Sequence, residues 1–257
     1  MTAVRPVVLA AALLCACARW FPAPEPMRSV AWPAAAPGPA AQPHARCLVV
    51  FLPGLGDDAE DFERNGFVAD MKHRGLSVDM VAAQATLGYY THGTFPERLA
   101  KDVVEPARAR GYPQVWLIGM SLGGMGTLYY ARSRAAGVTG LLALAPYLGE
   151  RDVIDEIDEQ GGLAGWVAPA RADALTPGNY QREIWRWLQA MARGQERGPD
   201  LYLGFGASDK LKREDALLAD ALPDDHVYLL PGAHDWKTWR QLFDQFLQGS
   251  DFARGCR

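Results

Sequence analysis

One serine stands in a setting that could make it a nucleophile. Ser121 is the middle residue of Gly119-Met-Ser-Leu-Gly123, which follows an apolar run and precedes a helical pattern. A nucleophile elbow needs a strand, a sharp turn with serine at its apex, and a helix, because the backbone there is strained. Amide groups at the start of the helix could also stabilise a developing oxyanion. Ser121 is therefore the predicted nucleophile, and a glycine-rich turn built only for packing is the alternative.

A serine nucleophile needs a base from elsewhere in the chain. The sequence contains five histidines, namely His44, His73, His92, His226 and His234. His234, in Pro231-Gly-Ala-His-Asp-Trp236, follows the last predicted strand, which is where such a base belongs. His44 lies in a proline-rich stretch, His73 in a helical pattern, and His226 at the start of a strand. We therefore predict that His234 is the general base.

A carboxylate that orients the base would complete a catalytic triad. Asp209, in Gly206-Ala-Ser-Asp-Lys210, follows a predicted strand and precedes His234 in the chain. Its alternative roles are those of a turn residue or of the N-cap of the next helix. Asp235 is a rival acid, but adjacent side chains seldom orient one another. We predict that Asp209 holds the imidazole of His234 in the required tautomer.

Alternating strand and helix patterns surround these loops. Apolar runs that predict buried strands lie at 47–52, 76–83, 115–120, 140–145, 201–206 and 226–230. Helical patterns lie at 59–74, 96–110, 122–136, 181–193, 213–221 and 236–247. This alternation predicts an α/β fold with a mostly parallel central sheet and helices on both faces. Ligands bind beyond the carboxyl ends of such strands, so we expect the chemistry in the loops there.

Two backbone amides are expected to form an oxyanion hole. One belongs to Leu122, the residue after the nucleophile. The other should come from the loop after the first parallel strand, Leu52-Pro-Gly-Leu-Gly-Asp-Asp58. There Gly54 and Gly56 flank Leu55 and leave the backbone free to approach a ligand.

Three of these loops resemble those of known esterases. The 52–58 loop resembles the HGLGD loop of acyl-protein thioesterases and carboxylesterases of the α/β-hydrolase superfamily, with Pro53 in place of histidine. Gly119-Met-Ser-Leu-Gly-Gly124 and Gly232-Ala-His-Asp-Trp-Lys-Thr-Trp239 are similar to the elbow and base loops of esterase D-like members. The resemblance implies an α/β-hydrolase fold, with the backbone donor of the first loop at Leu55. The chain order serine, aspartate, histidine also matches that fold.

The stretch 147–198 is predicted to form a small cap, since α/β-hydrolases carry insertions over the site at this point. Its acidic run over 150–159 is typical of an amphipathic helix with a solvated face, and an acidic rim against anionic substrates is the alternative. Tyr89, His92 and Trp166 are candidate substrate-lining residues. Aromatic core packing is the alternative role for Trp166.

The first 46 residues are expected to lie outside the fold. Arg5 and the apolar run over 7–18 are typical of a bacterial secretion signal. Leu14-Cys-Ala-Cys17 resembles a lipobox, which implies a signal over 1–17 and lipidation of Cys17; a plain signal peptide is the alternative. Residues 18–46, rich in proline and alanine, are predicted to form an extended tether. A catalytic domain would then span 47–257.

Two cysteines lie near the ends of that predicted domain, Cys47 and Cys256. A disulfide between them is plausible in an oxidising periplasm. The expected location is therefore the periplasm or, with the lipid anchor, the outer membrane.

Composition limits the classes of function. Across 257 residues, 49% are hydrophobic and 22% charged, which is the balance of an ordinary folded protein. A net charge of −4 argues against a nucleic-acid partner. No set of histidines and carboxylates has ligand spacing, so neither metal nor cofactor is implied.

The sequence favours a serine hydrolase acting on small-molecule or lipid esters or thioesters. Acyl transfer or peptide cleavage by the same triad, and a surface lipoprotein that only binds, are the alternatives.

Overall fold

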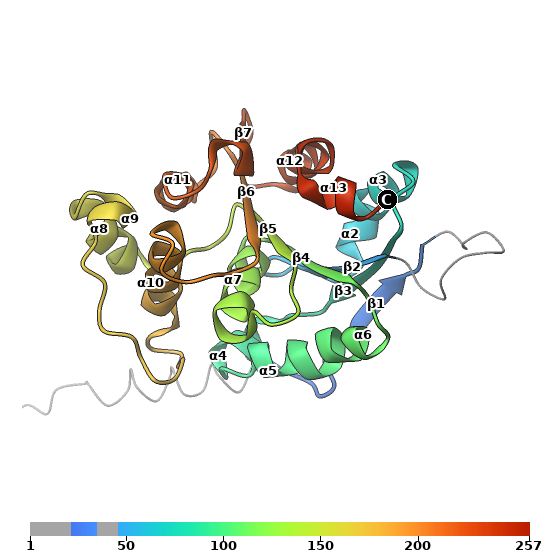
Figure 1. Cartoon of the computed structure of the whole chain (residues 1–257), viewed down its shortest axis with the longest axis horizontal. Coiled ribbons are helices and arrows are strands. Elements are labelled where there is room, and N and C mark those ends of the chain that lie inside the picture. The colour runs from blue at the N-terminus through green and yellow to red at the C-terminus, as the bar shows by residue number, and fades with distance from the viewer. Residues whose placement is uncertain (1–21, 35–45) are drawn as a thin grey trace, which may run out of the picture.

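A computed structural model describes residues 22–34 and 46–257. Within them a seven-stranded sheet has the order β1-β3-β2-β4-β5-β6-β7 (Figure 1). The strands are β1 (Ser29–Trp32), β2 (Cys47–Leu52), β3 (Val78–Ala83), β4 (Gln114–Met120), β5 (Gly140–Leu144), β6 (Asp200–Gly206) and β7 (Val227–Leu230). All neighbouring pairs are parallel except β1 and β3. The predicted, mostly parallel sheet is confirmed.

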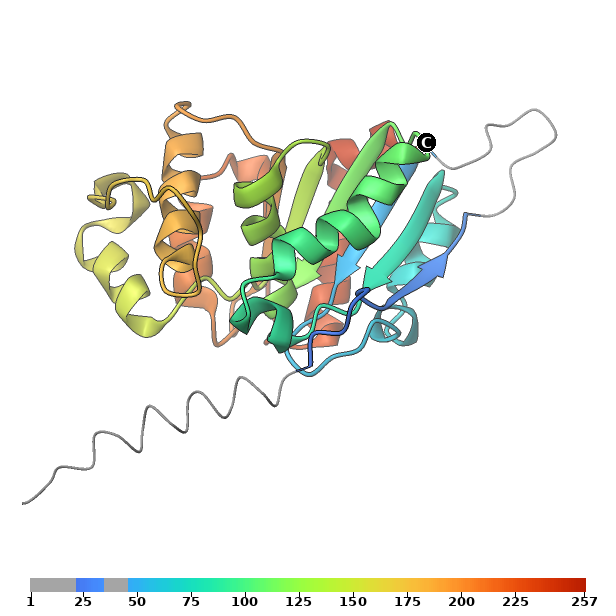
Figure 2. The same ribbon diagram turned by 90° about the horizontal axis from the view of Figure 1, so that it is seen from below.

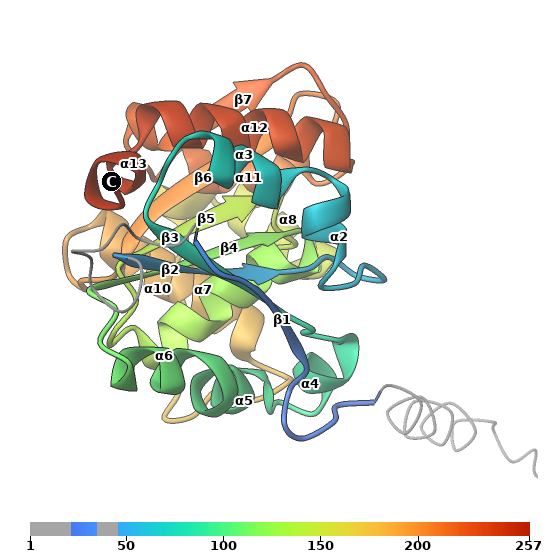
Figure 3. The same ribbon diagram turned by 90° about the vertical axis from the view of Figure 1, so that its right-hand side faces the viewer.

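Helices cover both faces of this sheet (Figure 3). One face carries α2 (Asp61–Arg64), α3 (Phe67–His73), α12 (Trp236–Gly249) and α13 (Asp251–Gly255). The other carries α4 (Leu87–Thr91), α5 (Phe95–Leu99), α6 (Glu105–Ala109), α7 (Leu122–Arg134) and α10 (Tyr180–Ala192). The remaining α-helices are α8 (Arg151–Glu159), α9 (Gly162–Gly165) and α11 (Lys212–Ala219). Within the described ranges, no helix is long and apolar enough to cross a membrane.

Aromatic side chains fill the space between the sheet and the face that carries α3 and α12. Phe51 of β2 stacks on Phe62 with ring centroids 4.5 Å apart. Phe67 of α3 stacks on Phe243 of α12 at 4.6 Å. All four are fully buried. Burial of each such side chain contributes about 2–3 kcal/mol, so this layer fixes α12 and the loop before it.

Two predicted helices are interrupted, each for a local reason. The pattern over 59–74 forms α2 and α3, separated at Gly66, which adopts the left-handed φ of 88°. The pattern over 96–110 is divided by a π-helical turn, Ala100–Val104. Pro106 follows this turn and has no N–H to donate to a preceding carbonyl.

The predicted tether over 18–46 is wrong for residues 22–34. Residues of β1 pair with β3, and both Met27 and Trp32 are buried. The Met27 N–H also donates to the Asp102 carboxylate at 2.7 Å. Two large apolar side chains and an otherwise open edge of β3 are enough to hold this segment on the domain. Of the rest of the predicted tether, 18–21 and 35–45 lie outside the described residues, and the Arg46 N–H donates to the Ser77 Oγ at 3.1 Å.

A disulfide joins the beginning of β2 to the last helix. The Sγ atoms of Cys47 and Cys256 are 2.02 Å apart, across 209 residues of sequence. This is the pairing that the sequence made plausible. It ties the C-terminal helix α13 to the edge of the sheet at which the parallel strands begin.

The predicted cap stretch forms α8, α9 and α10 beside the sheet (Figure 1). Buried Val153, Ile154 and Ile157 give α8 an apolar face. Its acidic face is paired with arginines: Arg213 contacts Asp155 and Asp158, and Arg182 contacts Asp152 and Glu156. The amphipathic-helix interpretation therefore accounts for the acidic run.

Candidate active site

The turn that carries Ser121 has strained backbone geometry. Ser121 adopts φ 51° and ψ −117°, a region that residues with side chains rarely occupy. Its N–H donates to the Leu144 carbonyl of β5 at 2.9 Å, and its carbonyl accepts from the Tyr147 N–H at 3.0 Å. A Cβ on Gly119 would lie 2.2 Å from the Gly123 carbonyl oxygen, so only glycine fits there. The adjacent strand and these glycines hold the hydroxyl at the apex, where α7 begins.

His234 connects the serine to a buried carboxylate. Its Nε2 lies 3.0 Å from the Ser121 Oγ, and its Nδ1 lies 2.9 and 3.0 Å from the Asp209 oxygens. The side chain of Asp209 is 0% exposed and that of His234 12%. Because a carboxylate can only accept, Nδ1 carries the proton and the Nε2 lone pair faces the serine hydroxyl. This arrangement can remove the hydroxyl proton.

The two competing acids have different partners. Asp209 also accepts from the Leu211 N–H at 2.9 Å, so it closes a local turn as well as contacting His234. Asp235 caps α12, and its carboxylate accepts from the Thr238 N–H at 2.8 Å. That backbone hydrogen bond lowers the pKa of Asp235. The structure therefore brings Asp209, and not Asp235, to the imidazole.

The glycine-rich loop after β2 runs beside the serine. A Cβ on Gly54 would lie 3.5 Å from the Ser121 Cβ and 2.6 Å from the Asp57 Oδ2. Leu55 and Leu122 line the same cavity as Ser121 and His234. The residues of both predicted amide donors therefore lie at the cavity that contains the serine. Pro53 replaces a side chain of the resembled family, but a backbone donor does not depend on it.

A hydrogen bond joins this loop to the loop of the histidine. The Trp236 Nε1 donates to the Asp57 Oδ1 at 3.2 Å. Burial raises the pKa of Asp57. Trp236 packs edge-on against Phe62 and Phe67, which fixes the indole. Both residues lie in the quoted motifs, but the sequence alone assigned them no role.

Two more carboxyl groups lie buried near Asp209. Glu214 and Asp215 stand on α11, directly after the Asp209 loop. Burial raises the pKa of Glu214 to about 7, although the nearby Leu148 backbone acts to lower this pKa. Burial raises the pKa of Asp215 well above its usual range, and both of its oxygens lack hydrogen-bond partners. Sequence reasoning missed this pair because charged helical residues are normally exposed.

A cavity of about 1090 Å³ opens over the serine. Its wall is rich in aromatic residues, which are Tyr90, Tyr147, Tyr180, Trp236 and Trp239. They come from α4, the loop after β5, the cap helix α10 and the start of α12. An apolar group bound to the serine would contact this wall.

The three predicted substrate-lining residues lie elsewhere, which corrects that prediction. Tyr89 is fully buried, and its hydroxyl donates to the Pro24 carbonyl. His92 is exposed at the end of α4. Trp166 is buried in the cap, where its Nε1 donates to Glu156 at 2.9 Å. Because α4 is a helix, Tyr90 points about 100° away from Tyr89 and reaches the cavity instead.

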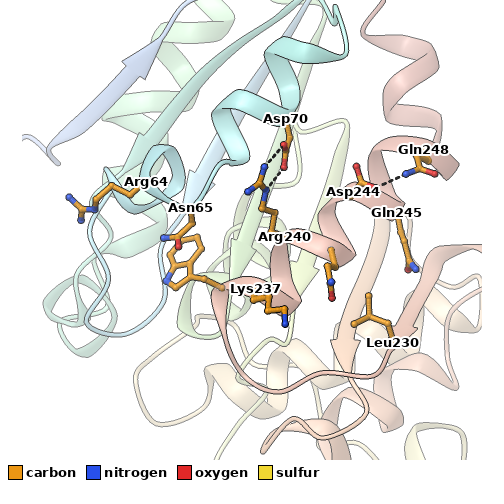
Figure 4. Close-up of a pocket in the computed structure, with 11 residues that line it drawn as sticks. Arg64, Asn65, Asp70, Leu230, Lys237, Arg240, Asp244, Gln245 and Gln248 are labelled. Carbon is orange, nitrogen blue, oxygen red and sulfur yellow. Dashed lines mark hydrogen bonds and ion pairs between the residues drawn. The ribbon is translucent and has the colours of Figure 1, made fainter.

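A second, more polar hollow of about 910 Å³ runs along α12 (Figure 4). Two of its charged groups are paired, since Arg240 donates two hydrogen bonds of 2.7 and 2.8 Å to Asp70. The amide of Gln248 donates one hydrogen bond to the carboxylate of Asp244. Neither Ser121 nor His234 lines it. The cavity over Ser121 is therefore the candidate active site.

The structure leaves two further sequence predictions, the lipidation and the absence of a metal, untested. Cys17, the predicted lipidation site, lies outside the described residues. In the part of the chain that the structure describes, no group of three or more histidine, cysteine or acidic side chains could hold a metal ion.

No protein-family model matches the sequence, and comparison with curated proteins finds no match. Solved structures do resemble the fold. A fluorophosphonate-binding serine hydrolase of Staphylococcus aureus matches with TM-score 0.62 and 14% identity over 86% of this chain and 91% of that one. An S-formylglutathione hydrolase of the same species gives 0.56 and 15% over 80% of each chain. Est1E of Butyrivibrio proteoclasticus gives 0.55 and 16% over 89% and 96%.

At such low identity these likenesses bear on architecture rather than on activity. The protein has the α/β-hydrolase fold.

Proposed function

We propose that the protein is a serine hydrolase that cleaves carboxylic esters or thioesters through an acyl-enzyme. The observation that carries this proposal is the continuous hydrogen-bonded chain from Ser121 through His234 to Asp209. A strained elbow for the serine and a large cavity lined by Leu55 and Leu122 support the same function. Structural neighbours named as hydrolases and esterases also support it.

In the first half-reaction, His234 takes the hydroxyl proton as the Ser121 Oγ attacks the carbonyl carbon. The amides of Leu55 and Leu122 stabilise the oxyanion of the tetrahedral intermediate. Collapse breaks the bond to the leaving group, and His234 gives its proton to the departing alcohol or thiol. Asp209 stabilises the imidazolium while it carries that proton.

The second half-reaction returns the enzyme to its starting state. His234 deprotonates a water molecule, which attacks the acyl carbon of the Ser121 ester. The second tetrahedral intermediate expels the serine oxygen, which regains a proton from His234. The products are the free acid and the unmodified enzyme.

Hydrolysis of p-nitrophenyl esters by two serine variants tests the proposal. Ser121→Ala should lose about 10³-fold or more of kcat, because only binding and the oxyanion site remain. Ser133→Ala is the matched control, since Ser133 lies on the same helix and bonds the Tyr129 carbonyl. Wild-type turnover by Ser121→Ala would overturn the assignment. A folded wild type without turnover would favour acyl transfer, peptide cleavage or a binding role.

We also propose that the protein is exported and lipidated at Cys17. The lipobox-like residues before Cys17 and a disulfide suited to an oxidising compartment support this. Growth with an alkyne-bearing palmitate should label wild type and Cys15→Ala, but not Cys17→Ala. Equal labelling of both variants would contradict the assignment.

A further inference from the structure

The described chain enters the domain beside the mouth of the active-site cavity. The Thr86 Oγ1 donates to the Pro22 carbonyl at 2.6 Å. Thr86 immediately precedes α4, and Leu87, Tyr90 and Thr91 of that helix line the cavity. In Figure 2 the first described residues lie next to α4, at the edge toward which the arrows of the parallel strands point.

This entry point is fastened to the domain. The Gln84 N–H donates to the Arg28 carbonyl at 2.8 Å, and the Arg28 side chain pairs with Glu60. Glu25 pairs with Arg98 at 2.9 Å. Together with the buried Met27 and strand β1, these contacts fix where the preceding residues must leave the surface.

The distance from that point to the proposed lipid anchor is short. Cys17 and Pro22 are five Cα steps apart, which span at most about 18 Å when fully extended. A folded domain of this size is about 45 Å across. An anchor at Cys17 therefore cannot hold the domain with the cavity on the side that faces away from the bilayer.

The mouth of the cavity offers apolar groups to such a surface. Leu55 is 65% exposed while lining the cavity, so its side chain lies at the opening. The partly buried Leu87 and the exposed Pro177 line the same cavity. Exposed apolar side chains such as those of Leu55 and Pro177 are suited to contact with lipid when they lie beside a binding site.

We propose that the cavity mouth rests against the lipid surface that holds Cys17, and that the substrate is an ester drawn from that bilayer. The substrate class rests on the proposed hydrolase function, whereas the orientation rests on the entry point and on lipidation. An apolar ester would pass from the bilayer over Leu55 and Leu87 to Ser121 without crossing bulk water. Its acyl chain would then occupy the aromatic-lined cavity.

A fluorescence-quenching experiment tests the orientation without using activity. Full-length lipidated protein is reconstituted in phosphatidylethanolamine and phosphatidylglycerol vesicles that carry a nitroxide headgroup lipid. In the processed lipoprotein Cys15 is lost with the signal peptide, Cys17 is lipidated and Cys47 is bonded to Cys256, so a dye labels only the thiol of Thr91→Cys or of the control Ala109→Cys. Thr91 lies at the cavity, and Ala109 is exposed at the end of α6, at the opposite edge of the sheet.

Quenching at position 91 should exceed that at position 109 about threefold or more, because the tether is shorter than the domain is wide. Equal quenching at the two positions would overturn the proposal. So would failure of the full-length protein to float with the vesicles.

A linker insertion tests the substrate class. About 30 Gly/Ser residues between Phe21 and Pro22 should reduce hydrolysis of a long-chain ester embedded in the vesicles about tenfold, because the effective concentration falls with tether length. Hydrolysis of a soluble acetate ester should stay constant. The same insert after Arg257 should change neither rate. If the insert between Phe21 and Pro22 leaves the hydrolysis rate of the embedded ester unchanged, the proposed substrate class is wrong. If the wild-type protein hydrolyses neither the embedded ester nor the soluble acetate ester, the result counts against the proposed function instead.

Discussion

The two edges of the central sheet differ in what they hold and in how they hold it. At the carboxyl ends of the strands, Ser121 and Ala145 adopt positive φ values of 51° and 41°. Buried carboxyl groups and a large cavity lie at the same edge. At the amino ends, Cys47 is bonded to Cys256, and the Ser77 N–H donates to the Cys256 carbonyl at 2.7 Å.

This contrast separates reactive groups from stabilising ones. Backbone strain costs about 1–3 kcal/mol at each such residue, and burial of a carboxyl group without partners costs more still. At the other edge Phe252 packs edge-on against Trp116, with the two ring centroids 5.2 Å apart. This contact adds to the stability that the disulfide provides at the same edge. Changes to the triad at the first edge should therefore alter activity, and changes at the second edge should alter stability. A buried carboxyl group at the first edge should add an effect on stability that depends on pH.

The largest expected effect separates two acids at the reactive edge. Asp209→Asn should lower kcat/KM about 10³- to 10⁴-fold, because His234 would no longer be held in the tautomer that accepts the serine proton. Asp235→Asn keeps a residue that caps helices well, so kcat/KM of this variant should fall by less than about tenfold. Ester hydrolysis and circular dichroism of both variants check this. Similar losses in the two variants would mean that the acid is wrongly assigned.

The opposite edge should respond in stability. Replacing Cys47 and Cys256 together with alanine should lower the free energy of unfolding by about 3–5 kcal/mol, because the disulfide closes a very long loop. Urea denaturation measures this change, and kcat of the folded variant should stay within about twofold of wild type. A large fall in kcat would show that the two edges are coupled.

A pH-dependent effect on stability is expected from Glu214. Its pKa is raised from the ordinary 4.5 to about 7, so the folded state prefers the neutral carboxyl. The stability that this group contributes is fully present below about pH 4.5 and is lost as the pH rises through about 7.

Glu214→Gln should therefore be more stable than wild type by about 1–3 kcal/mol at pH 8, with no difference at pH 4. Thermal unfolding at both pH values measures it, and Glu63→Gln on the exposed side of α2 is the control. If Glu214→Gln stabilises the protein equally at pH 4 and pH 8, the ionisation argument is contradicted.

The smallest expected effect concerns the cavity wall. Tyr180→Ala should lower kcat/KM about three- to tenfold for an octanoate ester and less for an acetate ester, because a long chain contacts more of the wall. Tyr89→Phe is the control, since its hydroxyl bonds Pro24 away from the cavity. Equal losses on both esters would mean that Tyr180 acts through folding.

The parallel strands and the Ser121, Asp209 and His234 loops could be predicted from sequence because their signals are local. Continuous apolar runs gave strand positions within about two residues, as expected for strands buried on both faces. The serine turn needs glycines at fixed positions, and the base follows a strand end. None of these features depends on distant residues.

Features that depend on tertiary contacts could not be predicted in this way. Strand β1 is short and forms because the edge of β3 is available. Tyr90, rather than Tyr89, lines the cavity because of the helical phase of α4, a helix that the sequence analysis did not predict. The burial of Asp215 results from the packing of α11, which its own sequence does not reveal.

The central claim is that His234 activates Ser121, and the rate of fluorophosphonate labelling tests it most directly. Wild type and His226→Ala should be labelled at the same rate, since His226 contacts the Leu201 carbonyl near the end of the sheet. His234→Ala should be labelled about 10³-fold more slowly, and peptide mass spectrometry should place the label on Ser121. Equal labelling rates for His234→Ala and wild type, or a label on another serine, would contradict the account.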